Sequence, residues 1–237
     1  RYAAPTGACM TQPLESIIQG PANPSGSVIW LHGLGASGDD FVPVLPLLQR
    51  PDLRFVLPHA PVRPVTINGG YPMRAWYDIT QMAPGPGREP ESDIRETASL
   101  VDMLIAEEQS RGVPAARILL VGFSQGGALA LHCALRWRER LAGVVALSTY
   151  LVLPDALDTE RARATDGMPA FFAHGIHDPT VPWDRGRHAF AMLSRHLDAT
   201  WFDYPMGHEL CIEEVGDLRA FLDRVLPALP PSTSPGG

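Results

Sequence analysis

The 237-residue chain contains no run approaching the roughly twenty apolar residues that a membrane-spanning helix requires. Cysteine is scarce as well: Cys9, Cys133 and Cys211 form an odd set in a chain too large to depend on disulfides. The first nine residues lack the apolar core of a signal peptide. We therefore expect a cytoplasmic protein without a transmembrane segment.

Basic residues are also fewer than acidic residues. The chain carries 19 basic and 26 acidic residues, for a formal net charge of −7 at pH 7, whereas a nucleic-acid surface needs a basic patch or stripe. We expect no nucleic-acid partner. The length and the hydrophobic content of 45% are those of one α/β domain with a substantial core.

Short apolar runs alternate with amphipathic runs along the chain, a pattern typical of βα units. The apolar runs predict strands at 28–32, 54–57, 118–123, 144–148, 170–174 and 200–204. The amphipathic runs predict helices at 39–49, 92–111, 125–137, 184–197 and 212–226. This order predicts a mostly parallel, doubly wound sheet flanked by helices, with ligands bound at the carboxyl ends of the strands.

The boundaries of the predicted domain follow from composition. We expect one domain over residues 13–226, preceded by an N-terminal extension over 1–12. Residues 227–237 are rich in Pro, Ser and Gly and are expected to be disordered. Residues 58–90 form a long irregular stretch, and such loops are often functional. This stretch is expected to wall the site with apolar side chains, but Pro and Gly interrupt it too often for a large helical lid.

The most informative motif is Gly122-Phe123-Ser124-Gln125-Gly126. An apolar, strand-like run precedes it and a helix-like run follows it. In that context the motif is typical of a nucleophile elbow, a strand-to-helix turn too sharp for side chains at the flanking glycines. A Gly/Ser-rich connecting turn is the alternative, and the motif alone does not exclude it.

Two residues further along the chain complete the hypothesis. A serine hydroxyl requires a base, and the base requires an orienting carboxylate. In hydrolases with this elbow, the order is Ser, then Asp or Glu, then His. Asp178 and His208 each follow a predicted strand in that order. We predict Ser124 as the nucleophile, His208 as the general base and then acid, and Asp178 as the orienting carboxylate.

Each of these residues also has another interpretation. Asp178 precedes a proline and His208 precedes a glutamate, so each alone could belong to a turn or a helix start. A metal site made of His174, His177 and Asp178 would lack a supporting His-Glu-x-x-His pair. Cys211 is near His208 but no elbow presents it as a nucleophile. We predict that the protein needs no metal and no cofactor.

A tetrahedral intermediate also needs donors for its negative oxygen. One is the backbone N–H of Gln125, at the start of the predicted helix, where the helix dipole assists. The second is the N–H of Leu34, in the Gly33-Leu34-Gly35 turn after the first predicted strand. Because the donor of Gln125 is its backbone, Gln125→Ala is expected to have a mild effect.

Five segments together resemble the phospholipase/carboxylesterase family of α/β-hydrolases, which includes acyl-protein thioesterases and small bacterial carboxylesterases. The segments are Leu31–Gly35, Pro58–Pro61, Gly122–Gly127, His174–Asp178 and Gly207–Glu209. The resemblance extends over roughly residues 13–226. Residues 64–71 and 76–79 look closest to the bacterial carboxylesterases.

The resemblance implies an α/β-hydrolase fold without a large lid domain, together with the same triad and oxyanion donors. It further implies that Trp76 and Val181 border the acyl site as substrate-binding residues. The chain departs from the family pattern at two positions. Ala36 follows the Gly-Leu-Gly turn where members often carry Asp, and Thr149 stands where thioesterase-like members often have Gly.

These observations predict a serine carboxylesterase that hydrolyses short- to medium-chain acyl esters through an acyl-enzyme intermediate. The expected partner is a small-molecule acyl ester, and a homodimer is left open. The alternatives are a hydrolase similar to the acyl-protein thioesterases or lysophospholipases, and a non-catalytic binding protein of the same fold. The latter class usually lacks a member of the triad, and all three residues are present here.

Overall fold

A computed structural model describes residues 13–81 and 88–229. The predicted N-terminal extension over 1–12 lies outside the described residues, as does the predicted disordered tail from residue 230 onward. Residues 227–229 are described, and they are exposed and outside any helix or strand.

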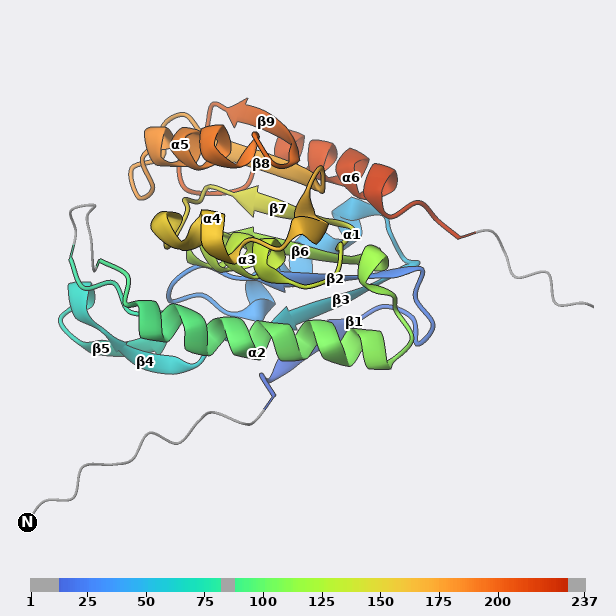
Figure 1. Cartoon of the computed structure of the whole chain (residues 1–237), viewed down its shortest axis with the longest axis horizontal. Coiled ribbons are helices and arrows are strands. Elements are labelled where there is room, and N and C mark those ends of the chain that lie inside the picture. Colours follow the sequence, from blue (N-terminus) through green and yellow to red (C-terminus); the bar gives the residue numbers. More distant parts are fainter. Residues whose placement is uncertain (1–12, 82–87, 230–237) are drawn as a thin grey trace, which may run out of the picture.

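A seven-stranded sheet forms the centre of the molecule (Figure 1). Strand β1 runs antiparallel to β3, whereas the other neighbouring strands are parallel. The parallel strands all end at one edge, where ligands bind in sheets of this kind. From one side to the other, the strands are β1 (Ser16–Gln19), β3 (Leu53–Pro58), β2 (Gly26–Leu31), β6 (Ile118–Phe123), β7 (Gly143–Leu147), β8 (Pro169–Gly175) and β9 (Asp198–Tyr204).

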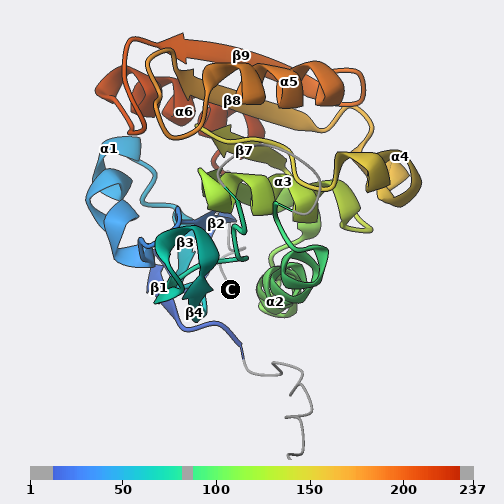
Figure 2. The same ribbon diagram turned by 90° about the vertical axis from the view of Figure 1, so that its left-hand side faces the viewer.

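Helices cover both faces of this sheet (Figure 2). One face packs against α2 (Glu91–Ser110), α3 (Gln125–Arg136) and α5 (Trp183–Leu193), with the short α4 (Leu157–Glu160) beside them. The other face packs against α1 (Leu45–Leu48) and α6 (Ile212–Val225).

The alternation of side chains along each strand explains why the sheet needs two layers of helices. In β6, Ile118 and Leu120 join the apolar core on the α2–α3 side. Leu119 and Val121 join the core on the α1–α6 side. Because β6 is buried on both faces, it reads in the sequence as a continuous apolar run, as parallel strands do.

Most predicted elements are present. The six predicted strands occur with ends within two residues of those expected, and four of the five predicted helices correspond to α2, α3, α5 and α6. The helix predicted at 39–49 is instead a 3-10 helix, Gly38–Val44, followed by the single turn of α1. Pro43 and Pro46 remove backbone donors from this segment, which explains why a continuous α-helix does not form.

The prediction of an irregular stretch over 58–90 was wrong in part. Residues 62–74 form an antiparallel hairpin, in which β4 (Val62–Val65) pairs with β5 (Tyr71–Arg74). Gly69 and Gly70 turn the chain between these strands with φ values of 68° and 76°. The described part of this stretch contains no large helical lid, as expected. Residues 82–87, which include Met82 of the predicted apolar wall, lie outside the described residues.

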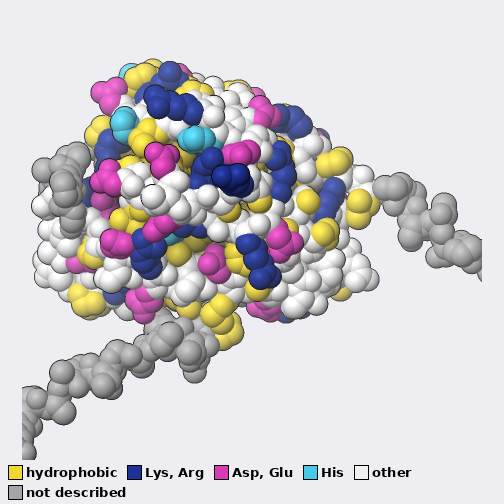
Figure 3. Space-filling model, viewed as in Figure 1, with side chains coloured by type: hydrophobic (Ala, Val, Ile, Leu, Met, Phe, Trp, Pro, Cys, Tyr) yellow, Lys and Arg dark blue, Asp and Glu magenta, His cyan; other side chains and the backbone are white. Residues whose placement is uncertain are grey.

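The described residues include no helix long and apolar enough to cross a membrane. On the face of the molecule that Figure 3 shows, the coloured acidic and basic side chains are interspersed among the described residues. On that face, no stripe of a single charge runs across them.

Glu214 makes the stability of the fold depend on pH. Its carboxylate is fully buried in α6, and neither oxygen has a hydrogen-bond partner among the described residues. Burial raises the pKa of Glu214 to about 8. The folded protein therefore keeps this proton to about pH 8, whereas the unfolded chain releases it near the ordinary value of 4.5. The contribution of Glu214 to the free energy of unfolding is therefore fully present below pH 4.5 and decreases as the pH rises towards 8.

We predict that Glu214→Gln removes this loss. The free energy of unfolding should match that of the parent at about pH 4 and exceed it at pH 8, since each pH unit between the two pKa values contributes up to about 1.4 kcal/mol. Urea unfolding at both pH values measures the difference. Glu213→Gln is the matched control, because Glu213 is an exposed neighbour. An unchanged pH dependence in Glu214→Gln would contradict the prediction.

Candidate active site

Ser124 occupies a strained turn between β6 and α3. Its φ of 54° and ψ of −122° lie in a region that non-glycine residues rarely adopt. The Ser124 N–H donates to the carbonyl of Leu147 at 2.9 Å. The Ser124 carbonyl accepts from the N–H of Ala128 at 3.1 Å and from the hydroxyl of Thr149 at 2.6 Å. Bonds on both sides of the residue therefore hold the unusual conformation.

The flanking glycines are required by close backbone contacts. A Cβ atom on Gly122 would lie 2.3 Å from the carbonyl oxygen of Gly126, and one on Gly126 would lie 2.4 Å from the carbonyl oxygen of His32. Both distances are far below contact, and the neighbours are backbone atoms that cannot move aside. The physical reason expected for the Gly-x-Ser-x-Gly pattern is therefore present.

The three side chains of the predicted triad are joined by hydrogen bonds. His208 Nε2 lies 2.9 Å from Ser124 Oγ, and His208 Nδ1 lies 2.7 Å from Asp178 Oδ2. An ionised carboxylate at Nδ1 favours the tautomer in which Nδ1 carries the proton, leaving Nε2 free to accept the proton of the serine hydroxyl. This tautomer is the one a general base requires.

Asp178 is held in its charged form. Burial by itself would raise the pKa of this carboxyl, but hydrogen bonds from His208 and from the amides of Val181 and Thr180 outweigh burial and lower the pKa. Both amides donate to Asp178 Oδ1 at 2.8 Å. One oxygen is therefore anchored by the loop after β8, while the other faces His208.

His174 supports the same loop from behind. Its Nε2 lies 2.9 Å from the carbonyl of Val181, and burial lowers the pKa of its ring. The same Nε2 also lies 3.6 Å from Asp178 Oδ2, but its hydrogen bond is made with the carbonyl of Val181. In the part of the chain that the structure describes, no group of three or more His, Cys, Asp or Glu side chains could hold a metal ion.

The two predicted oxyanion donors lie in turns that pack against each other. A Cβ on Gly33 would come 3.5 Å from the Cβ of Ser124, so the turn after β2 lies directly on the nucleophile. Within the described residues, neither the N–H of Leu34 nor that of Gln125 has an intramolecular acceptor. Both N–H groups are thus without an acceptor among the described residues, as oxyanion donors must be before a substrate binds.

A pocket of about 390 Å³ opens beside these groups, within the size range of small-molecule sites. Ser124 and His208 line it, and its apolar walls come from Leu34, Phe41, Phe123 and Leu210.

Trp76 and Val181 do not line this pocket, which corrects their predicted position at the border of the acyl site. Trp76 is fully buried and Val181 is 4% exposed. Val181 holds Asp178 through its amide, and the Trp76 indole N–H donates to the carbonyl of His32 at 2.8 Å. Both residues are buried, and their N–H groups bond to loops of the site.

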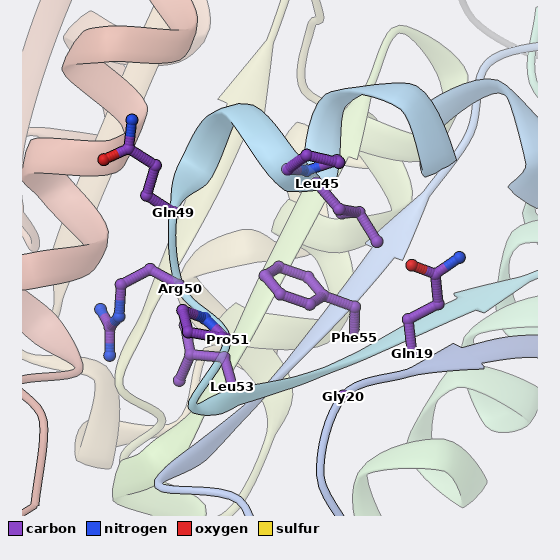
Figure 4. Close-up of a pocket in the computed structure, with 9 residues that line it drawn as sticks. Gln19, Gly20, Leu45, Gln49, Arg50, Pro51, Leu53 and Phe55 are labelled. Carbon is purple, nitrogen blue, oxygen red and sulfur yellow. The ribbon is translucent and has the colours of Figure 1, made fainter.

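A second hollow lies at the opposite edge of the sheet (Figure 4). Gln19, Phe55 and Leu53 are among the residues that line it. The one charged group on its wall, Arg50, is already bonded to Asp52, Asp223 and the carbonyl of Leu226. No Ser, Cys, His, Asp or Glu is among the residues that line this hollow.

The side chain of Gln125 has a role that the sequence did not indicate. Its Oε1 accepts from the N–H of Trp76 at 2.9 Å, and its Nε2 donates to the carbonyl of Tyr77 at 2.7 Å. The expectation that truncating Gln125 is mild therefore lacks its basis, because truncation would leave two buried backbone groups without partners. No spacing in the sequence links residue 125 to residues 76–77.

The architecture and the serine turn define an α/β-hydrolase. The profile of the Phospholipase/Carboxylesterase family matches residues 12–226, and the chain belongs to this family. It is therefore a serine hydrolase.

Similar proteins agree with this assignment. An acyl-protein thioesterase 1 of Mycosarcoma maydis is 37% identical, and the alignment covers 91% of this chain and 98% of that protein. The crystal structure of SOBER1 from Arabidopsis thaliana superposes with a TM-score of 0.79 at 27% identity, covering 85% of this chain and 99% of that one. The crystal structure of esterase PE8 gives a TM-score of 0.78 at 25% identity, covering 90% and 100%.

We predict that Thr149→Val lowers kcat, because it removes the hydroxyl that bonds the Ser124 carbonyl while keeping the shape of the side chain. The loss of one buried hydrogen bond should lower kcat by up to about tenfold. Thr149→Ser retains the hydroxyl and should restore most of the rate. The rates are measured with p-nitrophenyl butyrate, alongside thermal unfolding. Equal rates in the Val and Ser variants would show that the bond does not position Ser124.

Proposed function

We propose that the protein is a carboxylesterase that hydrolyses short- to medium-chain acyl esters through an acyl-enzyme on Ser124. The observation that carries this proposal is the hydrogen-bonded series Ser124, His208 and Asp178, at 2.9 Å and 2.7 Å. A serine, a base and a buried carboxylate in this arrangement have the components needed for acyl transfer.

In the proposed reaction, Ser124 Oγ attacks the acyl carbonyl while His208 Nε2 takes the hydroxyl proton. Asp178 stabilises the resulting imidazolium, and the amides of Leu34 and Gln125 bind the negative oxygen. His208 then protonates the departing alcohol as the C–O bond to it breaks. Water attacks the acyl-enzyme with its proton passing to His208, and release of the acid returns the hydrogen to Ser124.

The walls of the pocket support an apolar acyl group of modest size. Leu34, Phe41, Phe123 and Leu210 supply the apolar surface, and the described residues carry no helical lid over it. This arrangement favours a small ester over a substrate that needs an interfacial groove.

The charges on the pocket wall support a leaving group that is neutral or cationic. The charged side chains that line it are Asp40 and Glu209, and both residues are exposed. Two negative charges near the nucleophile repel an approaching anion and attract a cation.

An acyl-protein thioesterase is the second candidate. The observation that favours it is the 37% identity to the Mycosarcoma maydis protein named acyl-protein thioesterase 1, over nearly the full length of both chains. Esters and thioesters can use the same serine, base and oxyanion donors, so the triad by itself does not separate them. Rates on butyrylcholine and butyrylthiocholine, which differ only in the leaving atom, provide the comparison.

We predict that Ser124→Ala reduces kcat for p-nitrophenyl butyrate by a factor on the order of a million, as loss of the nucleophile does in other serine hydrolases. Circular dichroism checks that the variant is folded. Ser194→Ala, at an exposed helix end, is the matched control and should retain full activity. Substantial turnover by folded Ser124→Ala would refute the proposed nucleophile.

A further prediction concerns the charge of the leaving group. Butyrylthiocholine is cationic and S-butyryl-mercaptoethanesulfonate is anionic, with the same acyl chain. The ratio of their kcat/KM values should favour the cation by about tenfold or more at low salt, and should fall as salt screens the carboxylates. The double variant Asp40→Asn, Glu209→Gln should bring the ratio towards one. A ratio that does not respond to either change would show that these carboxylates do not select substrates.

A further inference from the structure

Trp76 connects the two turns that carry the candidate oxyanion donors. Its Nε1–H donates to the carbonyl of His32 at 2.8 Å, at the start of the turn that contains Leu34. Its backbone N–H donates to Oε1 of Gln125 at 2.9 Å. One residue therefore contacts both sides of the site while lining no part of the pocket.

The carboxamide of Gln125 completes this connection. Its Nε2 donates to the carbonyl of Tyr77 at 2.7 Å, so one orientation of the amide satisfies both bonds. Trp76 and Tyr77 are fully buried, and Gln125 is 2% exposed. Because water cannot replace these bonds, losing one leaves an unpaired polar group in the interior.

The turn after β2 is fixed at several atoms around Leu34. His32 Nε2 accepts the N–H of Ala60 at 3.0 Å, so in the neutral ring Nδ1 carries the proton and donates to the carbonyl of Gly33 at 2.7 Å. Burial lowers the pKa of His32 to about 4, which keeps the ring neutral near pH 7. The N–H of Gly35 donates to the carbonyl of Arg74 at 2.8 Å. Arg74 and Trp76 are therefore bonded to the two ends of this turn, at Gly35 and His32.

We propose that Trp76 is a positioning residue that sets the spacing between the amides of Leu34 and Gln125. The proposal rests on the proposed function, in which these amides bind the oxyanion. Donors that are fixed in advance stabilise the tetrahedral intermediate, whereas a displacement of about 1 Å can cost two orders of magnitude in rate. Trp76 acts on the reaction through these backbone groups and does not touch the substrate.

The test replaces Trp76 by Phe, which removes the indole N–H and keeps an aromatic ring. Trp137→Phe is the matched control, because the indole nitrogen of Trp137 is buried without a partner among the described residues and lies just beyond the end of α3. Three quantities are measured: kcat and KM with p-nitrophenyl butyrate, and the inhibition constant of an alkyl trifluoromethyl ketone. This ketone forms a tetrahedral adduct with an oxyanion, whereas the matching alkyl methyl ketone serves as a comparison that does so poorly.

We expect Trp76→Phe to lower kcat by about 10- to 100-fold with KM changed by less than about threefold. Binding of the trifluoromethyl ketone should weaken in parallel, while binding of the methyl ketone should be retained. A general loss of packing would weaken both ketones alike. Unchanged kcat and ketone binding would overturn the proposal, and so would a rise in KM alone, which would place Trp76 in contact with the substrate.

Gln125→Met provides a second test if Trp76→Phe does not fold. Methionine has a similar shape but cannot bond to the backbone of residues 76–77, so the same loss of kcat and of trifluoromethyl ketone binding is expected. A folded Gln125→Met with parental values would overturn the proposal. These outcomes are separate from a failure of the proposed function, which would appear as turnover by Ser124→Ala. An intact Ser124 dependence with no effect at Trp76 or Gln125 would refute the positioning role alone.

Discussion

The close approach between the β6–α3 turn and the turn after β2 is the constraint on which the site depends. Gly126 lies so near the carbonyl of His32 that a single added Cβ would overlap it at 2.4 Å. This contact places the turn that contains Leu34 against the turn that contains Ser124 and Gln125, and Ser124 has a strained conformation there. The strain is tolerated because the strand ends around it are bonded to one another, as buried polar backbone groups must be.

The polar side chains of the site fall into two groups, those that face the pocket and those that bond to the loops behind it. Ser124 and His208 face the pocket, while Asp178 is fixed by the amides of its own loop. Behind these groups, His174 bonds to a carbonyl of the loop that carries Asp178, and Trp76 bonds to the carbonyl of His32 at the start of the turn that carries Leu34. Each of these bonds restricts the next, so the reactive geometry exists before a substrate arrives.

The hairpin β4–β5 and the residues after it show where prediction from the sequence was weakest. Four-residue strands separated by residues 66–70 offer little periodicity, so the segment resembles an irregular loop. The side chains implied by family resemblance were harder still. Trp76 is expected to border the acyl site, yet it is fully buried and its indole N–H bonds to the carbonyl of His32. Resemblance conveys that a residue matters to a site but not which surface it faces.

The sequence by itself determined the serine turn, the order of the three polar residues and the alternation of strands and helices, because each of these is a local pattern of residue types. Only the tertiary structure decided that Gln125 would bond to residues 76–77, that Thr149 would bond to the carbonyl of Ser124, and that Asp40 and Glu209 would share one pocket. These contacts join residues far apart in the chain, so they follow from how the strands are ordered in the sheet, which no local pattern contains.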